Sequence, residues 1–303
     1  MPHLTVLLHE AIDNLNLKEG DIFVDGTLGG GGHSSLVAER FGEDVEIIGL
    51  DRDIDALEKS EERLRTFTSS LYLKQQSFRN IDTALSELGI KKVNAILLDL
   101  GLSSDQFEES GRGFTFQKDE PLLMTMDKDE KDFTAKVIVN SFDEDALELI
   151  IRGFGEEKFS RKIARKIVEI REVAPIETTF DLVNAVRAAT PAAYNRGRLH
   201  PATRTFQAIR IAVNEELTAL EEGLEKGFKL LENNGRFGII SFHSLEDRIV
   251  KNFFRDKVKE GVGKFITKKP LIPTDDEIVN NPRARSAKLR VIEKINSNNL
   301  EII

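Results

Sequence analysis

The chain has 303 residues, 40% of them hydrophobic and 31% charged, with a net charge of −9 and no cysteine. This composition is typical of a globular protein with a sizeable core, and it excludes disulfides, thiolate nucleophiles and cysteine-bound zinc. No apolar run approaches the roughly 20 residues that cross a bilayer, and the first residues lack the basic start of a secretory signal. We therefore expect a cytoplasmic protein without a membrane contact. The length allows two domains or one core with a large insertion.

Short β-branched runs alternate with helical patterns along much of the chain, as in a parallel sheet with crossover helices. The predicted strands are 21–25, 45–50, 71–74, 94–99 and 236–241, with two weaker ones near 264–268 and 287–293. About seven strands in this rhythm predict an α/β protein with a Rossmann-like sheet of the methyltransferase type.

The alternation stops after the fourth predicted strand, because residues 133–190 show helical patterns and no convincing strand. We predict an all-helical insertion domain at 109–199, within a core formed by 1–108 and 200–303. One long helix from about Arg204 to Leu231 is expected to return the chain to the sheet. Two helices of the insertion are predicted over 143–151, which has an acidic start, and over 158–171.

Four consecutive glycines, Gly29 to Gly32, follow the first predicted strand. Glycine adopts positive φ and lets the backbone approach a ligand, at the end of a strand where open α/β sheets bind ligands. The dinucleotide fingerprint G-x-G-x-x-G fails because its last position falls on Ser34, and the P-loop lysine is missing. A sulfonium nucleoside needs no pyrophosphate site, so this loop, preceded by Asp25, favours S-adenosylmethionine over NAD. A flexible turn is the alternative without a ligand.

Carboxylates stand at the ends of two further predicted strands. Asp51 lies where the ribose hydroxyls of an adenosine ligand would donate to it, and a helix N-cap at Asp51 or Asp53 is the alternative. Phe78, after the third strand, is a candidate adenine contact, although an isolated phenylalanine is more often part of the core. Asp99 ends the fourth strand, where a methyl acceptor is expected.

The net charge argues mildly against a nucleic-acid partner, but the basic residues are clustered. Arg161 to Lys166, Arg196 to Arg210 and Arg283 to Arg290 are the main runs. Each run can be a solvated helix face. The second and third are our candidates for contacts with RNA phosphates.

A series of motifs covers nearly the whole chain. They lie at 3–8, 32–34, 99–104, 112–116, 205–211, 214–215, 241–248 and 281–286. In this order they resemble the motifs of the small-subunit (16S) ribosomal RNA cytosine-N4 methyltransferases, the MraW or RsmH family.

The resemblance implies S-adenosylmethionine-dependent methylation of the N4 amino group of a specific cytidine in the decoding region of 16S rRNA. It implies a class I methyltransferase core interrupted by a helical domain, and 16S rRNA or the small ribosomal subunit as partner. A homo-oligomer is compatible with the sequence, and no metal is indicated. The implied cofactor contacts are Gly31, Gly32, His33, Asp51, Phe78, Asp99 and Gln106.

Asp99 and His243 are the candidate catalytic residues, as acceptors of the proton that the amino group releases, and water is the alternative acceptor. For His243, a structural hydrogen bond at a strand end is an equal alternative. We expect His33 to contact the cofactor through its backbone. A non-catalytic RNA-binding protein of ribosome assembly and an NAD-type oxidoreductase are the alternative functions.

One segment departs from the family pattern, which has Asp-Met-Arg-Met where this chain reads Leu123-Met124-Thr125-Met126. An acid and a base are lost together, which indicates replacement of a structural ion pair, a change that can be nearly neutral. The alternative is that one of the two side chains contacts the substrate.

Overall fold

The computed structural model describes residues 4–67, 70–102, 107 and 110–296. The chain divides into two compact units. The core unit comprises Met1–Gly101 and Leu217–Ile303, and the helical unit comprises Leu102–Glu216. The helical unit thus begins before and ends after the range 109–199 that the sequence suggested for an insertion.

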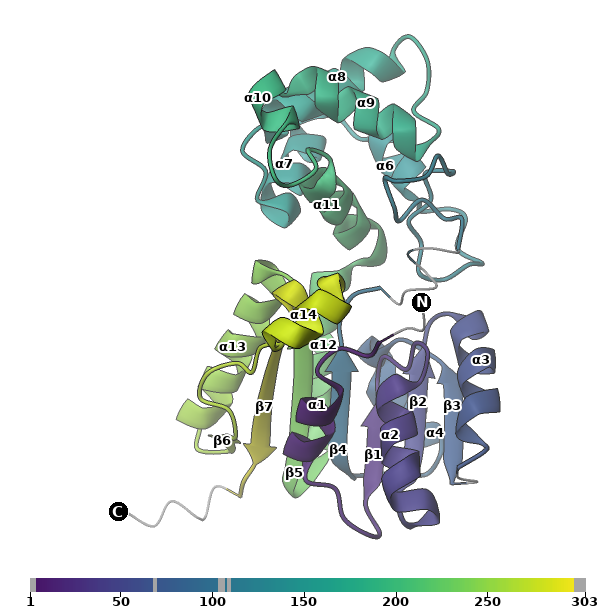
Figure 1. Cartoon of the computed structure of the whole chain (residues 1–303), viewed down its shortest axis with the longest axis vertical. Coiled ribbons are helices and arrows are strands. Elements are labelled where there is room, and N and C mark those ends of the chain that lie inside the picture. Colours follow the sequence, from purple (N-terminus) through teal and green to yellow (C-terminus); the bar gives the residue numbers. More distant parts are fainter. Residues whose placement is uncertain (1–3, 68–69, 103–106, 108–109, 297–303) are drawn as a thin grey trace. The chain divides into compact units, whose positions relative to one another are not determined.

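The core unit contains a seven-stranded sheet in the order β3-β2-β1-β4-β5-β7-β6, seen in Figure 1. Its strands are β1 (Ile22–Asp25), β2 (Glu46–Asp51), β3 (Leu71–Gln75), β4 (Val93–Asp99), β5 (Leu231–Ser241), β6 (Gly263–Phe265) and β7 (Lys288–Lys294). The first five strands are parallel, and β7 runs antiparallel to both β5 and β6. All seven predicted strands are present, although β5 begins earlier than predicted and β6 ends earlier.

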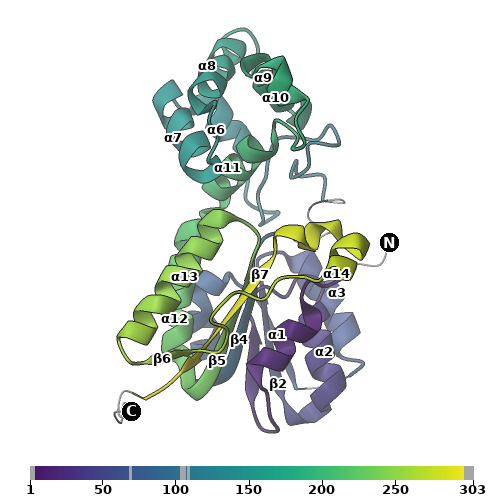
Figure 2. The same cartoon turned by 60° about the vertical axis from the view of Figure 1, so that its left-hand side comes forward.

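Helices cover both faces of this sheet, as Figures 1 and 2 show. One hydrophobic cluster joins the sheet to α1 (Leu8–Leu15), α2 (Gly32–Phe41) and α3 (Ile54–Leu64). A second cluster joins it to α4 (Ile81–Glu87), α12 (Glu216–Leu230) and α13 (Ser244–Lys259). The remaining elements of this unit are α14 (Asp275–Asn280) and the 3₁₀ turns Gly42–Asp44, Phe78–Asn80 and Pro282–Ser286. The sheet is therefore buried on both sides, which explains the continuous apolar runs of its strands.

The helical unit has a hydrophobic core of its own. Its helices are α6 (Ala135–Ser141), α7 (Glu144–Gly155), α8 (Ser160–Arg171), α9 (Thr179–Ala189), α10 (Ala192–Asn195) and α11 (Thr203–Asn214). Asp143 caps α7 by accepting a hydrogen bond from the Ala146 backbone N–H, which confirms the predicted acidic start. Among the helices that the structure describes in either unit, none has the length and hydrophobicity needed to cross a membrane.

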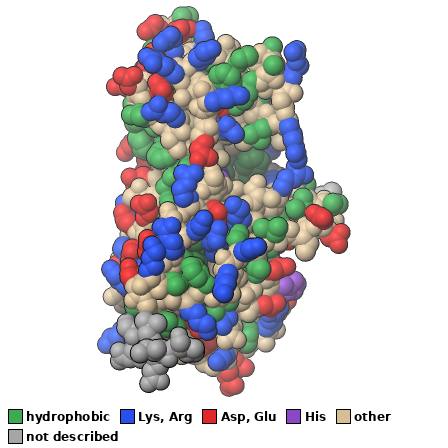
Figure 3. Space-filling view, turned by 90° about the vertical axis from the view of Figure 1, so that its left-hand side faces the viewer, with side chains coloured by type: hydrophobic (Ala, Val, Ile, Leu, Met, Phe, Trp, Pro, Cys, Tyr) green, Lys and Arg blue, Asp and Glu red, His purple; other side chains and the backbone are tan. Residues whose placement is uncertain are grey.

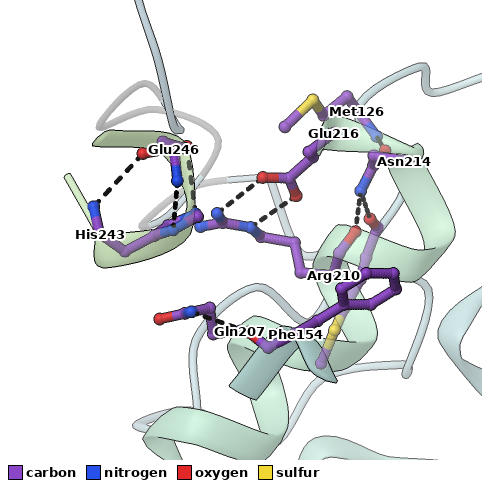
Figure 4. Close-up of polar contacts among 9 residues, drawn as sticks. Met126, Phe154, Gln207, Arg210, Asn214, Glu216, His243 and Glu246 are labelled. Carbon is purple, nitrogen blue, oxygen red and sulfur yellow. Dashed lines mark hydrogen bonds and ion pairs between the residues drawn. The ribbon is translucent and has the colours of Figure 1, made fainter. Parts of the chain in front are cut away.

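The single helix predicted from Arg204 to Leu231 is wrong, because the chain forms two helices there. Glu215, between α11 and α12, has a φ of 51°, and a left-handed residue interrupts the helical hydrogen bonds. Arg210 forms two hydrogen bonds of 2.8 Å with Glu216 around this break, as Figure 4 shows. The apolar periodicity continued across 215, so it concealed the interruption.

Candidate active site

The glycine loop connects β1 to α2 at the carboxyl end of the sheet. Gly31 has a φ of 69° and is the N-cap of α2, which leaves the first backbone N–H groups of the helix available to an anion. A Cβ at Gly32 would lie 1.8 Å from Oγ1 of Thr5, so no other residue fits there without movement. The loop therefore needs its glycines both for conformation and for close approach.

Asp51, at the end of β2, holds this loop in place. Its carboxylate accepts hydrogen bonds of 2.8 Å from the Gly29 N–H and 2.9 Å from the Asp53 N–H. Burial raises the pKa of the Asp51 carboxyl despite these bonds. Asp53, and not Asp51, is the N-cap of α3, since its side chain accepts from the Asp55 N–H. Asp51 is thus left at the loop with lone pairs for further donors.

Phe78 follows β3 and is half-buried. Its ring packs against α12, where a Cβ at Gly223 would lie 2.6 Å from it, and its Cβ is close to Gly26. The core contact expected of an isolated phenylalanine is therefore present. The side chain also stands beside the start of the glycine loop.

Asp99 ends β4, and its backbone N–H donates a 2.6 Å hydrogen bond to Oγ1 of Thr27. The side chain is 24% exposed, yet Oδ1 is buried and has no hydrogen-bond partner among the described residues. Burial raises the pKa of the Asp99 carboxyl well above its ordinary value, and the charges of Asp25 and Glu246 raise it further. An orphaned acceptor among negative neighbours is costly, which indicates a site shaped for a donor or a cation.

Asp25, at the end of β1, belongs to the same group of acids. It accepts a 2.7 Å hydrogen bond from the Ser34 hydroxyl and a 3.3 Å bond from the Thr27 N–H. Burial nevertheless raises its pKa to about 6, with a smaller contribution from Asp51. We call Asp25, Asp99 and Glu246 the acid cluster. Of its members, only Asp99 was a candidate site residue from the sequence, where Asp25 was noted as the residue that precedes the glycine loop.

His33 is buried in the first turn of α2. Its Nε2 lies 3.2 Å from the carbonyl oxygen of Val6, and its Nδ1 lies 3.9 Å from Oδ2 of Asp99. From the sequence, only a backbone contact with the cofactor was expected here. The imidazole in fact connects the N-terminal segment to the edge of the acid cluster.

His243 is the N-cap of α13, and it forms a reciprocal capping box with Glu246. Its Nδ1 accepts from the Glu246 N–H at 3.4 Å, and Oε2 of Glu246 accepts from the Phe242 and His243 N–H groups. The other carboxylate oxygen lies 3.2 Å from Nε2 of His243, an ion-pair distance without hydrogen-bond geometry (Figure 4). His243 therefore makes the structural hydrogen bond at a strand end that was the alternative to a catalytic role.

Gly101, two residues after Asp99, has a φ of 110°, a conformation that only glycine adopts readily. A Cβ there would lie 3.5 Å from the ring of Phe242. The predicted cofactor contact Gln106 lies outside the described residues.

The segment Leu123 to Met126, which departs from the family pattern, is held through its backbone. Arg112 donates to the carbonyl oxygens of Thr125 and Met126 at 3.1 and 2.7 Å. Asn214 donates to the Met124 carbonyl at 2.7 Å and accepts from the Met126 N–H at 2.9 Å (Figure 4). Because these bonds involve main-chain atoms, they do not depend on the side chains at 123 and 125.

The sheet order, the glycine loop after β1 and the carboxylates after β2 and β4 together define a class I methyltransferase. The model of the MraW methylase family matches residues 1–295, and the chain belongs to that family. Among the relatives is the ribosomal RNA small subunit methyltransferase H of Clostridium botulinum (strain Loch Maree / Type A3). It is 48% identical over 97% of this chain and 99% of its own. The protein of the same name from Brevibacillus brevis is 45% identical over 97% and 98%.

Proposed function

We propose that this protein transfers a methyl group from S-adenosylmethionine to the N4 amino group of a cytidine in the decoding region of 16S ribosomal RNA. The observation that carries the proposal is Asp99, a strand-end carboxylate with a buried, unpartnered oxygen next to the glycine loop. Membership of a methylase family decides against the NAD-type oxidoreductase. The small-subunit rRNA substrate follows the names of the relatives.

The residues at the carboxyl end of the sheet fit the cofactor. S-adenosylmethionine supplies a methyl group already activated on a positively charged sulfur. The N–H groups of the first turn of α2, at Gly32 and His33, suit its carboxylate, whereas the Gly31 N–H donates to the Leu28 carbonyl oxygen at 2.7 Å. Asp51 accepts hydrogen bonds from the ribose hydroxyls, and Phe78 offers its remaining surface to the adenine. The negative acid cluster is complementary to the sulfonium and the ammonium groups.

Asp99 addresses the main difficulty of the reaction, which is that the N4 lone pair of cytosine is delocalised into the ring. The carboxylate accepts a hydrogen bond from the amino group, so the nitrogen can rehybridise while it is held in line with the methyl carbon. As the N–C bond forms and the C–S bond breaks, the nitrogen loses a proton to Asp99. The raised pKa of this carboxyl makes it a better proton acceptor than an ordinary aspartate.

His243 has a positioning role in this proposal. Its capping box with Glu246 fixes the start of α13 and a carboxylate whose charge raises the pKa of Asp99. The base has to reach the site out of its stack, so the target cytidine is unpaired or flipped. The arginines in 196–210 and 283–290 are candidate phosphate contacts. The reaction belongs in the cytoplasm, where small subunits assemble.

The test uses purified protein, immature small ribosomal subunits and S-adenosylmethionine labelled in the methyl group. We expect one label per subunit, located in 16S rRNA. Binding to the subunits without transfer would support the assembly-factor alternative and contradict the proposal. Calorimetric titration with S-adenosylmethionine and with NADH provides the cofactor control, in which only the former is expected to bind.

A further inference from the structure

Helix α13 carries a row of basic side chains, Arg248, Lys251, Arg255 and Lys259, all of them exposed. They are spaced by three, four and four residues, so they lie on one side of the helix. The opposite side is buried through Val250 and Phe254. We call these four residues the α13 basic row. The face of the core unit that holds it is in view in Figure 3, where Lys and Arg side chains gather around α13.

The acids next to this row are neutralised by neighbours. Asp247 forms ion pairs of 3.0 Å with Lys288 and 2.7 Å with Arg290 on β7. Asp256 lies within 3.4 Å of Arg255 and 3.6 Å of Lys259, in exposed pairs that are worth little. The row therefore has four basic side chains against Asp256, the one exposed acid of α13, in a chain whose net charge is −9. A solvated helix face needs no such segregation of charge.

The position of the row connects it to the acid cluster. α13 begins directly after β5, whose end pairs with the end of β4 at Asp99 and Ile240. Glu246, in the first turn of α13, is close enough to raise the pKa of Asp99. The row starts within one turn of this point and extends about 16 Å along the helix. An RNA strand whose target nucleotide enters the site therefore has the basic side chains of α13 beside it.

We propose that the α13 basic row binds the phosphates of the RNA strand next to the target nucleotide. This inference rests on the proposed function, since it assumes an RNA substrate. The row contacts phosphates only, so it contributes affinity and orientation without reading sequence. The acid cluster repels phosphates, whereas the row attracts them, and the two together keep the backbone outside while the base enters.

The test is the triple variant Lys251→Gln, Arg255→Gln, Lys259→Gln. Its matched control is Lys18→Gln, Lys91→Gln, Lys229→Gln, which removes three exposed charges just before the amino ends of β1, β4 and β5, whereas the acid cluster lies at the carboxyl end of the sheet. Binding of 16S rRNA in immature small subunits is measured at several salt concentrations. At 0.1 M salt we expect affinity about 100-fold weaker, and a salt dependence lower by about 2 in logarithmic slope, since each single-strand phosphate contact contributes about 0.7.

In the methylation assay, KM for the subunit should rise with the loss of affinity, while kcat and the affinity for S-adenosylmethionine stay unchanged. The control should keep the wild-type salt dependence. If the triple variant also keeps it, the row does not bind RNA, although the proposed function stands as long as the wild type methylates the subunits. If the wild type transfers no methyl group to the subunits, the proposed function itself fails.

Discussion

Two groups of aspartates in the core unit have opposite environments. Asp247, on α13, is paired with two cations, and their hydrogen bonds lower its pKa although burial opposes them. Asp25, buried at the end of β1, and Asp99, partly buried at the end of β4, repel each other, and burial raises the pKa of both. A stable fold has no use for the second arrangement, because each unpaired charge costs free energy. The paired acid therefore supports the structure, and the unpaired acids serve a ligand.

The largest effect is expected at the unpaired acid. Asp99→Ala should slow methyl transfer by about 1000-fold at saturating cofactor, because it removes the acceptor for the amino proton. Affinity for the small subunit should be nearly unchanged. Single-turnover rates measure the first, and filter binding the second. Asp44→Ala, at an exposed aspartate on the amino-end side of β2, is the control. A variant at Asp99 with full activity would remove the proposed role.

Substitution of the paired acid, Asp247, should change the stability of the fold instead of the rate of methyl transfer. Asp247→Asn leaves Lys288 and Arg290 without their charged partner, and we expect a loss of about 2 kcal/mol in the free energy of unfolding in urea. Since the pKa of Asp247 is lowered in the fold, its contribution is present above pH 4 and is lost as the pH falls below that. The variant should thus lose less stability than the wild type between pH 5 and pH 3. An unchanged unfolding midpoint at pH 7 would contradict the structural role.

The conservative change Asp99→Asn should increase the stability of the ligand-free protein, whereas Asp247→Asn should decrease it. Because the pKa of Asp99 is raised in the fold, the ligand-free wild type loses stability as the pH rises above the ordinary value. Asp99→Asn removes this loss, and at pH 7 its thermal midpoint should be higher by about 2–4 °C. Differential scanning calorimetry without cofactor measures the difference. A lower midpoint would mean that Asp99 stabilises the fold as Asp247 does.

The smallest effect concerns protons. Asp25 has a pKa of about 6, and a cationic ligand in contact with the acid cluster lowers it. Binding of S-adenosylmethionine at pH 6 should therefore release a fraction of a proton, and release should disappear near pH 8. Calorimetric titrations in two buffers with different ionisation enthalpies measure it. Equal heats in both buffers at pH 6 would mean that binding releases no proton, which would contradict a contact between the ligand and the acid cluster at Asp25.

The strand ends were predictable, and with them Asp51 and Asp99. Both faces of the sheet are covered, so β1, β2 and β4 are nearly continuous apolar runs that each end at an aspartate. The glycine loop was predictable for a similar reason, since four glycines between a strand and a helix have few other uses.

Other features depend on geometry that no local pattern encodes. Glu215 takes a left-handed conformation within a periodic apolar pattern, so the break between α11 and α12 was missed. The ring of His33 turns inward towards Asp99 because of where α2 starts. Glu246 lies in the first turn of a helix, where acids are common, and its place in the acid cluster follows only from the pairing of β4 with β5.

The most direct test of the central claim is the identity of the methylated atom. Immature small subunits are incubated with the protein and S-adenosylmethionine, and their 16S rRNA is digested to nucleosides and mapped by mass spectrometry. We predict N4-methylcytidine at one position in the decoding region, and none with Asp99→Ala. A methyl group on carbon 5 of the base, on a ribose or in another rRNA would contradict the account.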